Sequence, residues 1–468
     1  MSHRHVASFR VIYMSFLACL AAVSTTAAAQ EAPTWSAGVA SVKITPDKPV
    51  VLAGYAARVK PHESVDIDLY AKALALKDGQ GNRAVLVTID LCILPRDVAE
   101  PVRARIAERA GLEPAAVLLS VSHTHSAPAV SLGAPPIAGP ASRPVNPTSP
   151  ANIEYTRQLQ DKLVAVADKA LGALQPATLS WGTGVADIAM NRRQFTDKGV
   201  ILGVNPRGLV DRSVPVLRVD GADGKPRAVL FGYACHCTTV PSSHLGISGD
   251  YAGYARAFVQ EKYPGAEALF MAGCGGDANP YPRQSPAHAP KHGQTLGEEV
   301  CRVLETKLQP ISGTLKCALV TANLPLQTPD RATLEETAGT GSGVFKESAQ
   351  RMLATLDAGG KLPATYPVPV AAWQFGKEFT LISLPEEVVV DYVQRMEEAV
   401  GPLRLWVAAY CHEVAGYIPS RRVLKEGGYE TRGLYLDVGW FAPEVEEALT
   451  AAAREAAVKA GREVPKTE

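Results

Sequence analysis

The stretch VLLSVSHTHSAPAV, residues 117–130, joins a short segment typical of a buried strand to a His-Thr-His sequence and a Pro-containing turn. Side chains two residues apart in extended backbone point to the same side. The spacing therefore predicts that His123 and His125 face one cavity at the end of a strand. Paired imidazoles at such a position suit a metal site. Packing or hydrogen bonding would explain the same pair, so this stretch alone leaves both interpretations open.

The first residues predict a cleaved secretory signal peptide at 1–29. Arg4 and Arg10 precede an apolar stretch at 11–23, and an Ala-x-Ala pattern stands directly before Gln30. The apolar stretch is short for a membrane span, and no later segment approaches the ~20 apolar residues that a spanning helix needs. We therefore expect residues 30–468 to form a mature protein that is secreted or periplasmic and has no transmembrane segment.

Composition argues against a nucleic-acid partner. The chain carries 47 Lys and Arg against 47 Asp and Glu, so it has no excess of basic residues to bind phosphates. Of its 8 cysteines, one lies in the predicted signal peptide. The odd number that remains leaves at least one thiol unpaired, and the scattered spacing matches no disulfide framework. We expect most of them to be small buried side chains, and the sequence leaves their disulfide state and the oligomeric state open.

Hydrophobic periodicity predicts an α/β protein. We expect strands at residues 35–50, 69–77, 84–90, 117–121, 177–189, 214–234, 269–272, 315–326, 371–384 and 403–410. Helices alternate with them, and Asp97 and Asp250 are predicted as N-caps. No repeat or compositional break divides residues 30–468, so we predict a single large domain with a mixed β-sheet, flanking helices and an active site at the strand ends. The Pro-rich segment 132–152 is either a pocket rim or a disordered insertion.

Four predicted strand ends carry side chains that metals favour. They are His123 with His125, His236, Glu386 with Glu387, and His412 with Glu413 and Tyr417. A catalytic zinc takes about three protein ligands and keeps one position for water. Two histidines and one carboxylate from separate strand ends would meet that need. Cys235 and Cys237 flank one histidine, but in a strand both would point away from the imidazole.

Five short motifs stand in the order found in a known family. They are HTHSAP at 123–128, ACH at 234–236 followed by SGDYAGYA at 248–255, GGDANP at 275–280, LPEE at 384–387 and GYIPS at 416–420. Over residues 38–435 the chain resembles the catalytic domain of the neutral/alkaline, non-lysosomal ceramidase family. Little follows beyond one helix, so we expect no counterpart of the family's C-terminal immunoglobulin-like domain.

The resemblance implies a zinc-dependent amidase with one catalytic Zn²⁺. Carried over to this sequence, the implied ligands are His123, His236, Glu387 and Tyr417. The family usually has a Gly where this chain has Glu386, which leaves two adjacent carboxylates as candidates for one ligand position. Tyrosine is an uncommon zinc ligand, so only the resemblance points to Tyr417. Whether a further Ca²⁺ or Mg²⁺ binds stays open.

The resemblance also implies residues that act on the substrate. His125 would hydrogen-bond to the substrate carbonyl, and Tyr429 stands where the family has a second active-site tyrosine. Arg192 would bind a polar head group or simply pair with an acid. Asp277 would orient a histidine or cap the glycine turn. Asn279 stands where ceramidases commonly have a serine, so a serine nucleophile is excluded there, whereas a zinc-activated water needs none.

The sequence thus predicts an exported zinc amidase that hydrolyses the N-acyl amide bond of ceramide or a related N-acyl lipid to fatty acid and amine. Zinc-activated water would attack, with His125 or Tyr429 donating to the oxyanion. Two alternatives stay open: an amidase for another N-acylated metabolite or peptide, and a non-catalytic lipid- or glycan-binding member of the fold. Transient contact with a membrane surface is also expected, while the acyl chain and head group are not predicted.

Overall fold

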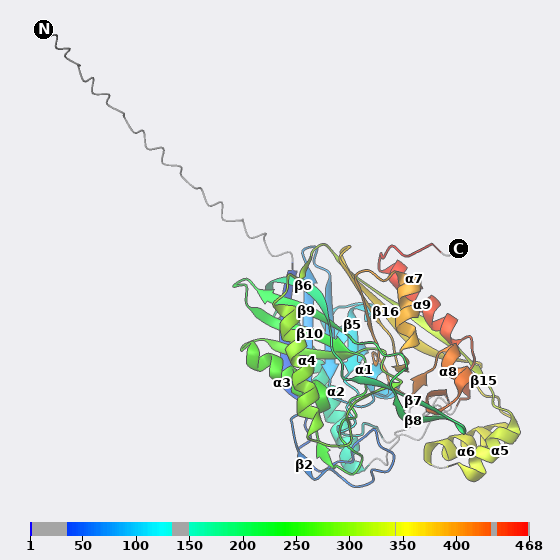
Figure 1. Cartoon of the computed structure of the whole chain (residues 1–468). Coiled ribbons are helices and arrows are strands. Elements are labelled where there is room, and N and C mark those ends of the chain that lie inside the picture. Colours follow the sequence, from blue (N-terminus) through cyan, green and yellow to red (C-terminus); the bar gives the residue numbers. More distant parts are fainter. Residues whose placement is uncertain (2–34, 133–148, 342, 432–437, 467–468) are drawn as a thin grey trace. The chain divides into compact units, whose positions relative to one another are not determined.

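The computed structural model describes Met1 and residues 35–132, 149–341, 343–431 and 438–466. The predicted signal peptide and most of the Pro-rich segment 132–152 lie outside the described residues, so both stay predictions. Residues 33–468 group into one compact unit. Within this unit two β-sheets lie face to face, and helices cover the outer face of each (Figure 1).

The larger sheet has nine strands in the order β12-β10-β9-β6-β1-β3-β4-β5, with β14 paired to β6. Parallel pairing joins β4 to β5 and β10 to β12, and the other neighbours are antiparallel, so the sheet is mixed. Its strands are β1 (Trp35–Lys43), β3 (Tyr70–Asp78), β4 (Arg83–Ile89), β5 (Val117–Val121), β6 (Gln175–Val185), β9 (Ser213–Gly221), β10 (Pro226–Tyr233), β12 (Glu267–Ala272) and β14 (Gln309–Ile311).

The smaller sheet has five strands in the order β19-β17-β16-β15-β21. They are β15 (Leu315–Gln327), β16 (Thr365–Phe375), β17 (Phe379–Ser383), β19 (Leu405–Ala408) and β21 (Trp440–Phe441). A separate three-stranded sheet joins β13 (Ala278–Pro280), β7 (Ala189–Thr196) and β8 (Gly199–Asn205). Two short parallel pairs join β2 (Ser64–Val65) to β11 (Gly246–Ile247) and β18 (Glu387–Val388) to β20 (Tyr417–Ile418).

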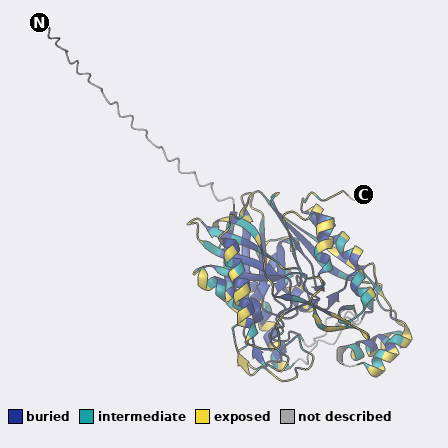
Figure 2. Ribbon diagram, in the orientation of Figure 1, coloured by how far each residue is buried: buried dark blue, intermediate teal, exposed yellow. Residues whose placement is uncertain are grey.

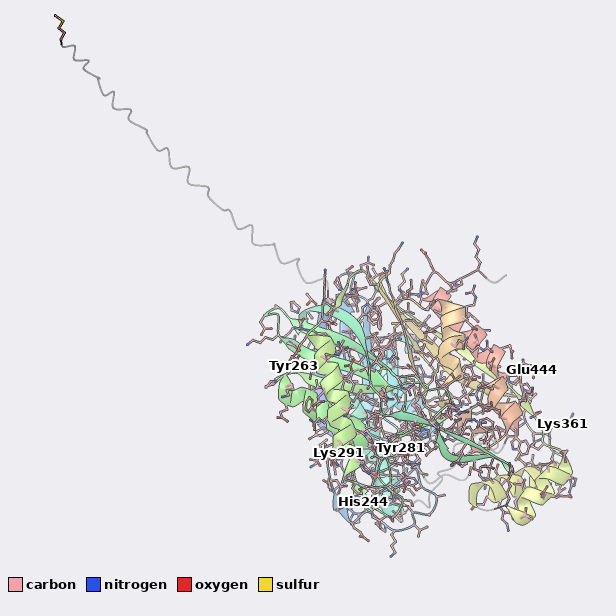
Figure 3. All side chains as sticks on the ribbon, viewed as in Figure 1. His244, Tyr263, Tyr281, Lys291, Lys361 and Glu444 are labelled. Atoms are coloured by element: carbon pink, nitrogen blue, oxygen red, sulfur yellow. The ribbon has the colours of Figure 1, made fainter. Side chains whose placement is uncertain are left out.

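The helices divide between the two outer faces. On the larger sheet lie α1 (Arg96–Ala110), α2 (Pro150–Gly172), α3 (Asp250–Lys262) and α4 (His288–Leu304), and on the smaller sheet lie α7 (Asp391–Val400) and α9 (Val445–Lys459). Two short elements, α8 (Arg421–Glu426) and the 3-10 turn η2 (Tyr429–Thr431), follow β20, and η1 (Pro114–Ala116) precedes β5. The helical hairpin of α5 (Arg331–Thr340) and α6 (Gly343–Asp357) has its own apolar cluster. Figure 3 marks this hairpin by Lys361, just after α6.

Strand alternation builds one core between the sheets and another beneath the helices. In β3, Leu74 and Leu76 belong to the cluster that contains Trp373 of the smaller sheet, whereas Ala73 and Ala75 belong to the cluster that contains the helices. Figure 2 accordingly shows the strands largely buried and the outward sides of the helices exposed. The predicted α/β domain with a mixed sheet and flanking helices is confirmed. Periodicity did not reveal the second sheet, because a strand alternates in the same way whichever element covers it.

Both predicted helix caps are wrong. The N-cap of α1 is Pro95, and Asp97 lies in the first turn instead. The N-cap of α3 is Gly249, which has no capping side chain. The carboxylate of Asp250 instead accepts the backbone N–H group of Thr239 at 2.9 Å. This bond ties the start of α3 to the segment that follows β10.

Candidate active site

The segments that follow β5, β10, β12, β17 and β19 meet at a common edge of the two sheets. Backbone hydrogen bonds hold them together across the sheets. The N–H group of Val121 donates to the Tyr410 carbonyl at 3.0 Å, and that of Ala409 donates to the Ala272 carbonyl at 2.9 Å. Loops that are far apart in the chain therefore place their side chains in one buried region.

His123, His236 and Glu387 form the centre of this region. One ligand atom from each lies within 4.8 Å of the other two, and Nε2 of each histidine is 3.1 Å from Oε2 of Glu387. All three side chains are buried. Glu386 points elsewhere, because its carboxylate accepts the backbone N–H groups of Ala415 and Gly416. Of the two adjacent carboxylates, Glu387 is therefore the one beside the histidines.

The hydrogen bonds of the two imidazoles direct a lone pair of each ring to the centre. Nδ1 of His123 is 2.6 Å from the Cys92 carbonyl, and Nδ1 of His236 is 2.8 Å from the Gly275 carbonyl. A carbonyl only accepts, so each Nδ1 carries a proton, and in the neutral form of each ring the lone pair lies on Nε2 and faces the centre. Within the described residues, Oε2 of Glu387 is buried without a hydrogen-bond partner. Three electron-pair donors facing one point are the arrangement that a divalent cation needs, so these residues fit a metal.

The pKa values of the two histidines also favour a bound cation at the centre. Burial alone would lower the pKa of His123, but the Glu387 carboxylate outweighs it and raises that pKa to about 10. Burial and the Arg192 guanidinium together lower the pKa of His236 to about 3. Without a cation, the buried carboxylate thus draws one proton to a histidine. A bound metal would take the place of that proton.

Tyr417 stands beside this group because of strand register. It is the direct partner of Glu387 in the parallel β18–β20 pair. Its hydroxyl lies 3.2 Å from Nε2 of His236, and the two rings are stacked at an interplanar angle of 12°. The four ligands that the family resemblance implies are therefore brought together, although nothing in the structure tests whether each binds metal.

His125 lies next to the centre, but the expected reason is wrong. β5 ends at Val121, and His123 has a left-handed backbone with φ 59°, so the two histidines do not share an extended strand. The backbone N–H group of His125 donates to the Cys237 carbonyl at 3.1 Å, which leaves the two Nε2 atoms 3.1 Å apart. Burial lowers the pKa of His125 well below its usual value. The ring is therefore neutral at physiological pH and can donate to or accept from a substrate.

Backbone strain gathers at the same strand ends. Positive φ angles cost energy in residues with a side chain and mark functional sites when they cluster. Among the described residues, seven other than glycine have positive φ, and four of them follow strands at this edge: His123, Glu386, Tyr410 and His412. The sequence does not reveal this strain, because positive φ is uncommon in every residue type other than glycine and depends on the tertiary surroundings.

Arg192 reaches the centre from β7. Its Nε donates to Glu430 at 2.9 Å, and its Nη1 lies 2.9 Å from Nε2 of His236. The guanidinium carbon is 5.4 Å from the ring centre of Tyr417 and 5.7 Å from that of Tyr429. The predicted pairing with an acid is present, while Nη2 stays buried without a hydrogen-bond partner in the described part of the chain.

Tyr429 and Asn279 complete the surroundings of the centre. The ring of Tyr429 lies 5.6 Å from that of Tyr417. The side-chain oxygen of Asn279 accepts the Thr238 hydroxyl at 3.1 Å and lies 3.5 Å from Nη1 of Arg192. Tyr429 thus lies beside the predicted ligand Tyr417, and Asn279 lies beside Arg192.

Asp277 does not contact the histidines. Its carboxylate accepts the backbone N–H group of Val390 at 2.9 Å and the side-chain amide of Asn191 at 3.1 Å. Burial raises the pKa of Asp277 to about 6. The expectation that it orients a histidine is therefore wrong. Asp277 instead joins the glycine turn to β7 and to the segment just after Glu387.

Two further strand-end candidates lie outside the centre. His412 is 3.0 Å from the Ser383 hydroxyl, and Glu413 forms an ion pair with Arg96. Neither belongs to the groups of potential ligands found in the described residues. The seven described cysteines are all free, and five of them are buried, which agrees with the expectation of small buried side chains.

Sequence reasoning missed three residues of the site. Cys92 supplies the carbonyl that fixes His123, and with His123 and His125 its thiol forms a second group of potential ligands. Tyr410 packs its ring 4.6 Å from that of His123. Glu430 binds both Arg192 and Arg193. Only Glu430 had a sequence signal, because it follows Tyr429; the other two are neighbours only in three dimensions.

Two buried histidines, a carboxylate and an adjacent tyrosine at strand ends form a donor set typical of mononuclear metal-dependent hydrolases. Residues 35–279, more than half of the chain, match the sequence model of the family described as neutral/alkaline non-lysosomal ceramidase, N-terminal. The chain belongs to this family, which confirms the resemblance stated from the motifs.

Two individual proteins with similar sequences are neutral ceramidases. Neutral ceramidase B of Dictyostelium discoideum is 30% identical over 227 residues, which are 46% of this chain and 29% of that protein. Neutral ceramidase A of the same organism is 27% identical over 211 residues, 42% of this chain and 28% of that protein. The matched segments thus span less than a third of the length of these relatives.

A solved structure shows the same fold. The neutral ceramidase from Pseudomonas aeruginosa matches with a TM-score of 0.68 at 18% identity, covering 94% of this chain and 76% of that one. A structure described as ceramidase complexed with C2 matches equally well, with a TM-score of 0.68. Among the described helices, each falls short of the length and apolar character that crossing a bilayer requires.

Proposed function

We propose that this protein is a zinc-dependent amidase that hydrolyses the N-acyl amide bond of ceramide or a related N-acyl lipid, releasing a fatty acid and an amine. The observation that carries the proposal is the convergence of His123, His236 and Glu387 on one buried point, in a chain of the ceramidase family. The names of its relatives indicate the substrate class. The proposal includes export after cleavage of a signal peptide at residues 1–29.

Four residues would hold the metal in this proposal. His123 and His236 offer neutral Nε2 atoms, Glu387 offers its unpaired Oε2, and Tyr417 lies next to both His236 and Glu387. Nitrogen and oxygen donors of this kind suit Zn²⁺. When bound, the cation would polarise the amide carbonyl and lower the pKa of a water molecule.

Residues around the metal position would stabilise the transition state. Negative charge develops on the carbonyl oxygen as the amide is attacked, and preorganised donors in a buried site stabilise that charge strongly. Arg192 offers its unpaired Nη2 group, and Tyr429 offers a hydroxyl whose pKa is raised by burial to about 12, so that it keeps its proton. His125, being neutral, can accept a proton from the attacking water and pass it to the leaving amine.

Asn279 bears on the route of hydrolysis. An amide side chain cannot act as a nucleophile, and its oxygen is already bound to the Thr238 hydroxyl. Water must therefore attack the substrate directly in the proposed reaction. No acyl-enzyme is expected at this position, so a pre-steady-state burst of amine product should be absent.

The experiment that tests the proposal combines metal analysis with an amide panel. The purified protein should hold about one zinc ion per chain and release fatty acid from fluorescent N-acyl sphingosines. His123→Ala should lose metal and activity together. Full hydrolysis by a folded, metal-free His123→Ala protein would refute the metal assignment. Bound zinc without hydrolysis of any amide would favour a binding protein, and turnover limited to N-acyl amino acids would favour an amidase of another class.

A further inference from the structure

The hairpin of β7 and β8 and the turn that follows it expose several large apolar side chains. Phe195, Ile201, Leu202, Val204 and Leu209 are between 42% and 58% exposed. They occupy one short stretch of chain, and we call these five side chains the apolar hairpin patch. The other exposed large hydrophobic side chains of the described residues are dispersed along the sequence. Single exposed apolar residues are normal, but a contiguous group marks a binding surface.

One edge of this hairpin has no partner strand among the described residues. β7 pairs with β13 on one side and β8 on the other, and β8 has no further partner strand among the described residues. Figure 3 labels Tyr281, just after β13, whose backbone N–H group donates to the Ile188 carbonyl at the base of β7. An open edge strand with apolar side chains invites association. A partner therefore has to be sought outside the described chain.

Register places apolar side chains on both faces of the hairpin. Phe195 pairs with Val200, and Gln194 pairs with Ile201. Side chains of directly paired residues share one face, and neighbours along a strand alternate. Phe195 and Val200 thus lie on one face, while Ile201 lies on the other. A flat protein partner would cover one face, whereas entry into a lipid interface buries both.

The hairpin is continuous with the candidate active site. Arg192, beside the proposed metal ligands, belongs to β7 itself. A Cβ atom built on Gly428 would lie 3.1 Å from Cγ1 of Val200, so the hairpin packs against the residue that precedes Tyr429. A lipid held at the hairpin therefore starts next to the residues that would act on it.

Charge around the apolar hairpin patch favours an anionic surface. Lys198 at the turn and Arg207 after β8 are exposed. Neither side chain forms an ion pair within the described residues, and Asp197 is the only acid between residues 195 and 209. Apolar side chains bordered by basic ones are typical of protein segments that lie in the interface of anionic membranes.

We propose that the β7–β8 hairpin docks the protein on an anionic lipid bilayer, with the apolar hairpin patch entering the boundary between headgroups and acyl chains. Lys198 and Arg207 contact the headgroups. The reason for docking rests on the proposed function, since an N-acyl lipid substrate resides in such a surface. The binding itself does not depend on turnover and can be measured separately.

The test is cosedimentation with vesicles of phosphatidylcholine, with and without phosphatidylglycerol. The double variant Phe195→Ser, Leu202→Ser should lower the partition coefficient at least about tenfold, because it removes two large apolar side chains from the lipid contact. Lys198→Glu with Arg207→Glu should abolish the preference for phosphatidylglycerol vesicles. Equal unfolding temperatures would show that the variants are folded.

Leu403→Ser is the matched control. Leu403 is 75% exposed but precedes β19, at the opposite end of that strand from Tyr410 and the candidate site. This variant should bind vesicles as the wild type does. An unchanged partition of the Phe195→Ser, Leu202→Ser protein would overturn the proposal. So would light scattering that shows a wild-type dimer dissociated by the double variant without loss of vesicle binding.

Activity separates this proposal from the proposed function. The ratio of turnover on vesicle-borne substrate to turnover on a dissolved short-chain N-acyl substrate should fall in the Phe195→Ser, Leu202→Ser protein. If no amide is hydrolysed by any variant while vesicle binding still depends on the hairpin, the proposed function fails and docking stands. If hydrolysis occurs but the hairpin substitutions leave vesicle binding unchanged, the docking proposal is refuted and the proposed function is retained.

Discussion

Glu386 and Glu387 show how much one position matters at the candidate site. They are adjacent, both buried and both carboxylates, yet one binds backbone N–H groups and the other faces two histidines. Left-handed backbone at Glu386 (φ 62°) turns the chain between them. The chemistry of the pair therefore depends on backbone conformation rather than on residue type.

Replacing each glutamate by glutamine should separate their roles. Glu387→Gln removes the negative charge that a cation needs at this point, and we expect loss of bound zinc and of amidase activity by at least about a hundredfold. Glu386→Gln keeps an acceptor oxygen for Gly416 and should retain the metal. Elemental analysis and initial rates measure both. Metal loss from Glu386→Gln alone would contradict the assignment.

Lys72 should make the free energy of unfolding depend on pH, and this effect does not involve the candidate metal centre. Its Nζ is buried and lies 2.8 Å from Glu267, and burial lowers its pKa to about 8. Between about pH 8 and pH 10.5 the unfolded chain keeps this proton while the folded chain has lost it, so the free energy of unfolding should rise with pH. Relative to Lys72→Met, we expect a gain of up to about 3 kcal/mol across this range. Urea unfolding at several pH values measures the free energy of unfolding of both proteins. The same pH dependence in the wild type and in Lys72→Met would refute the prediction.

At the scale of elements, the packing of α3 on α4 depends on glycine. A Cβ atom on Gly293 would lie 2.4 Å from Cβ of Tyr254 and 2.9 Å from the Tyr251 carbonyl oxygen. The backbone of α3 cannot move aside in the way that the end of a flexible side chain can. The two helices therefore approach closely only because α4 has no side chain at this position.

Gly293→Ala should accordingly lower the free energy of unfolding by about 1–3 kcal/mol, because it forces the two helices apart. Gly172→Ala, at the end of α2, is the control: a Cβ there meets nothing within 4 Å. That variant should be neutral or more stable by about 0.5 kcal/mol, since alanine favours a helix. Denaturant midpoints compare the two, and equal effects would show that helix contact is not the cause.

The elements also show where periodicity succeeds and where it fails. Most strands and helices were predicted near their observed bounds, because alternation and helical spacing follow from burial of one face. The β7–β8 hairpin was missed, since its apolar side chains are exposed on both faces and follow no core-facing pattern. The predicted cap at Asp250 was misplaced because a tertiary contact holds its carboxylate at the loop after β10.

At the scale of the whole molecule, the centre joins the two sheets. His123 and His236 follow strands of the larger sheet, whereas Glu387 follows β17 of the smaller sheet and Tyr417 lies in the segment after β19. A cation held by these side chains would therefore link the sheets as well as serve catalysis. Metal binding should contribute to the stability of the entire unit.

Removal of the metal tests this link. A chelator should lower the unfolding temperature of the wild type, with a loss of about 2.7 kcal/mol if metal was present at a hundred times its dissociation constant. The Glu387→Gln protein should unfold at a lower temperature than the wild type, and the chelator should not change its unfolding temperature. Calorimetry with and without added zinc measures both. An equal effect of chelator on Glu387→Gln would place the stabilising metal elsewhere.

The sequence by itself determined the α/β class, most elements, the family and the residues from which the centre is built. Each depends on local patterns: burial of one face, or a motif such as HTHSAP. Only the tertiary structure decided which glutamate faces the histidines, that Asp277 contacts Asn191, and that a missed hairpin exposes an apolar surface beside the site. The physical reason is that these facts depend on contacts between segments far apart in the chain and on strained backbone at strand ends, neither of which leaves a local pattern.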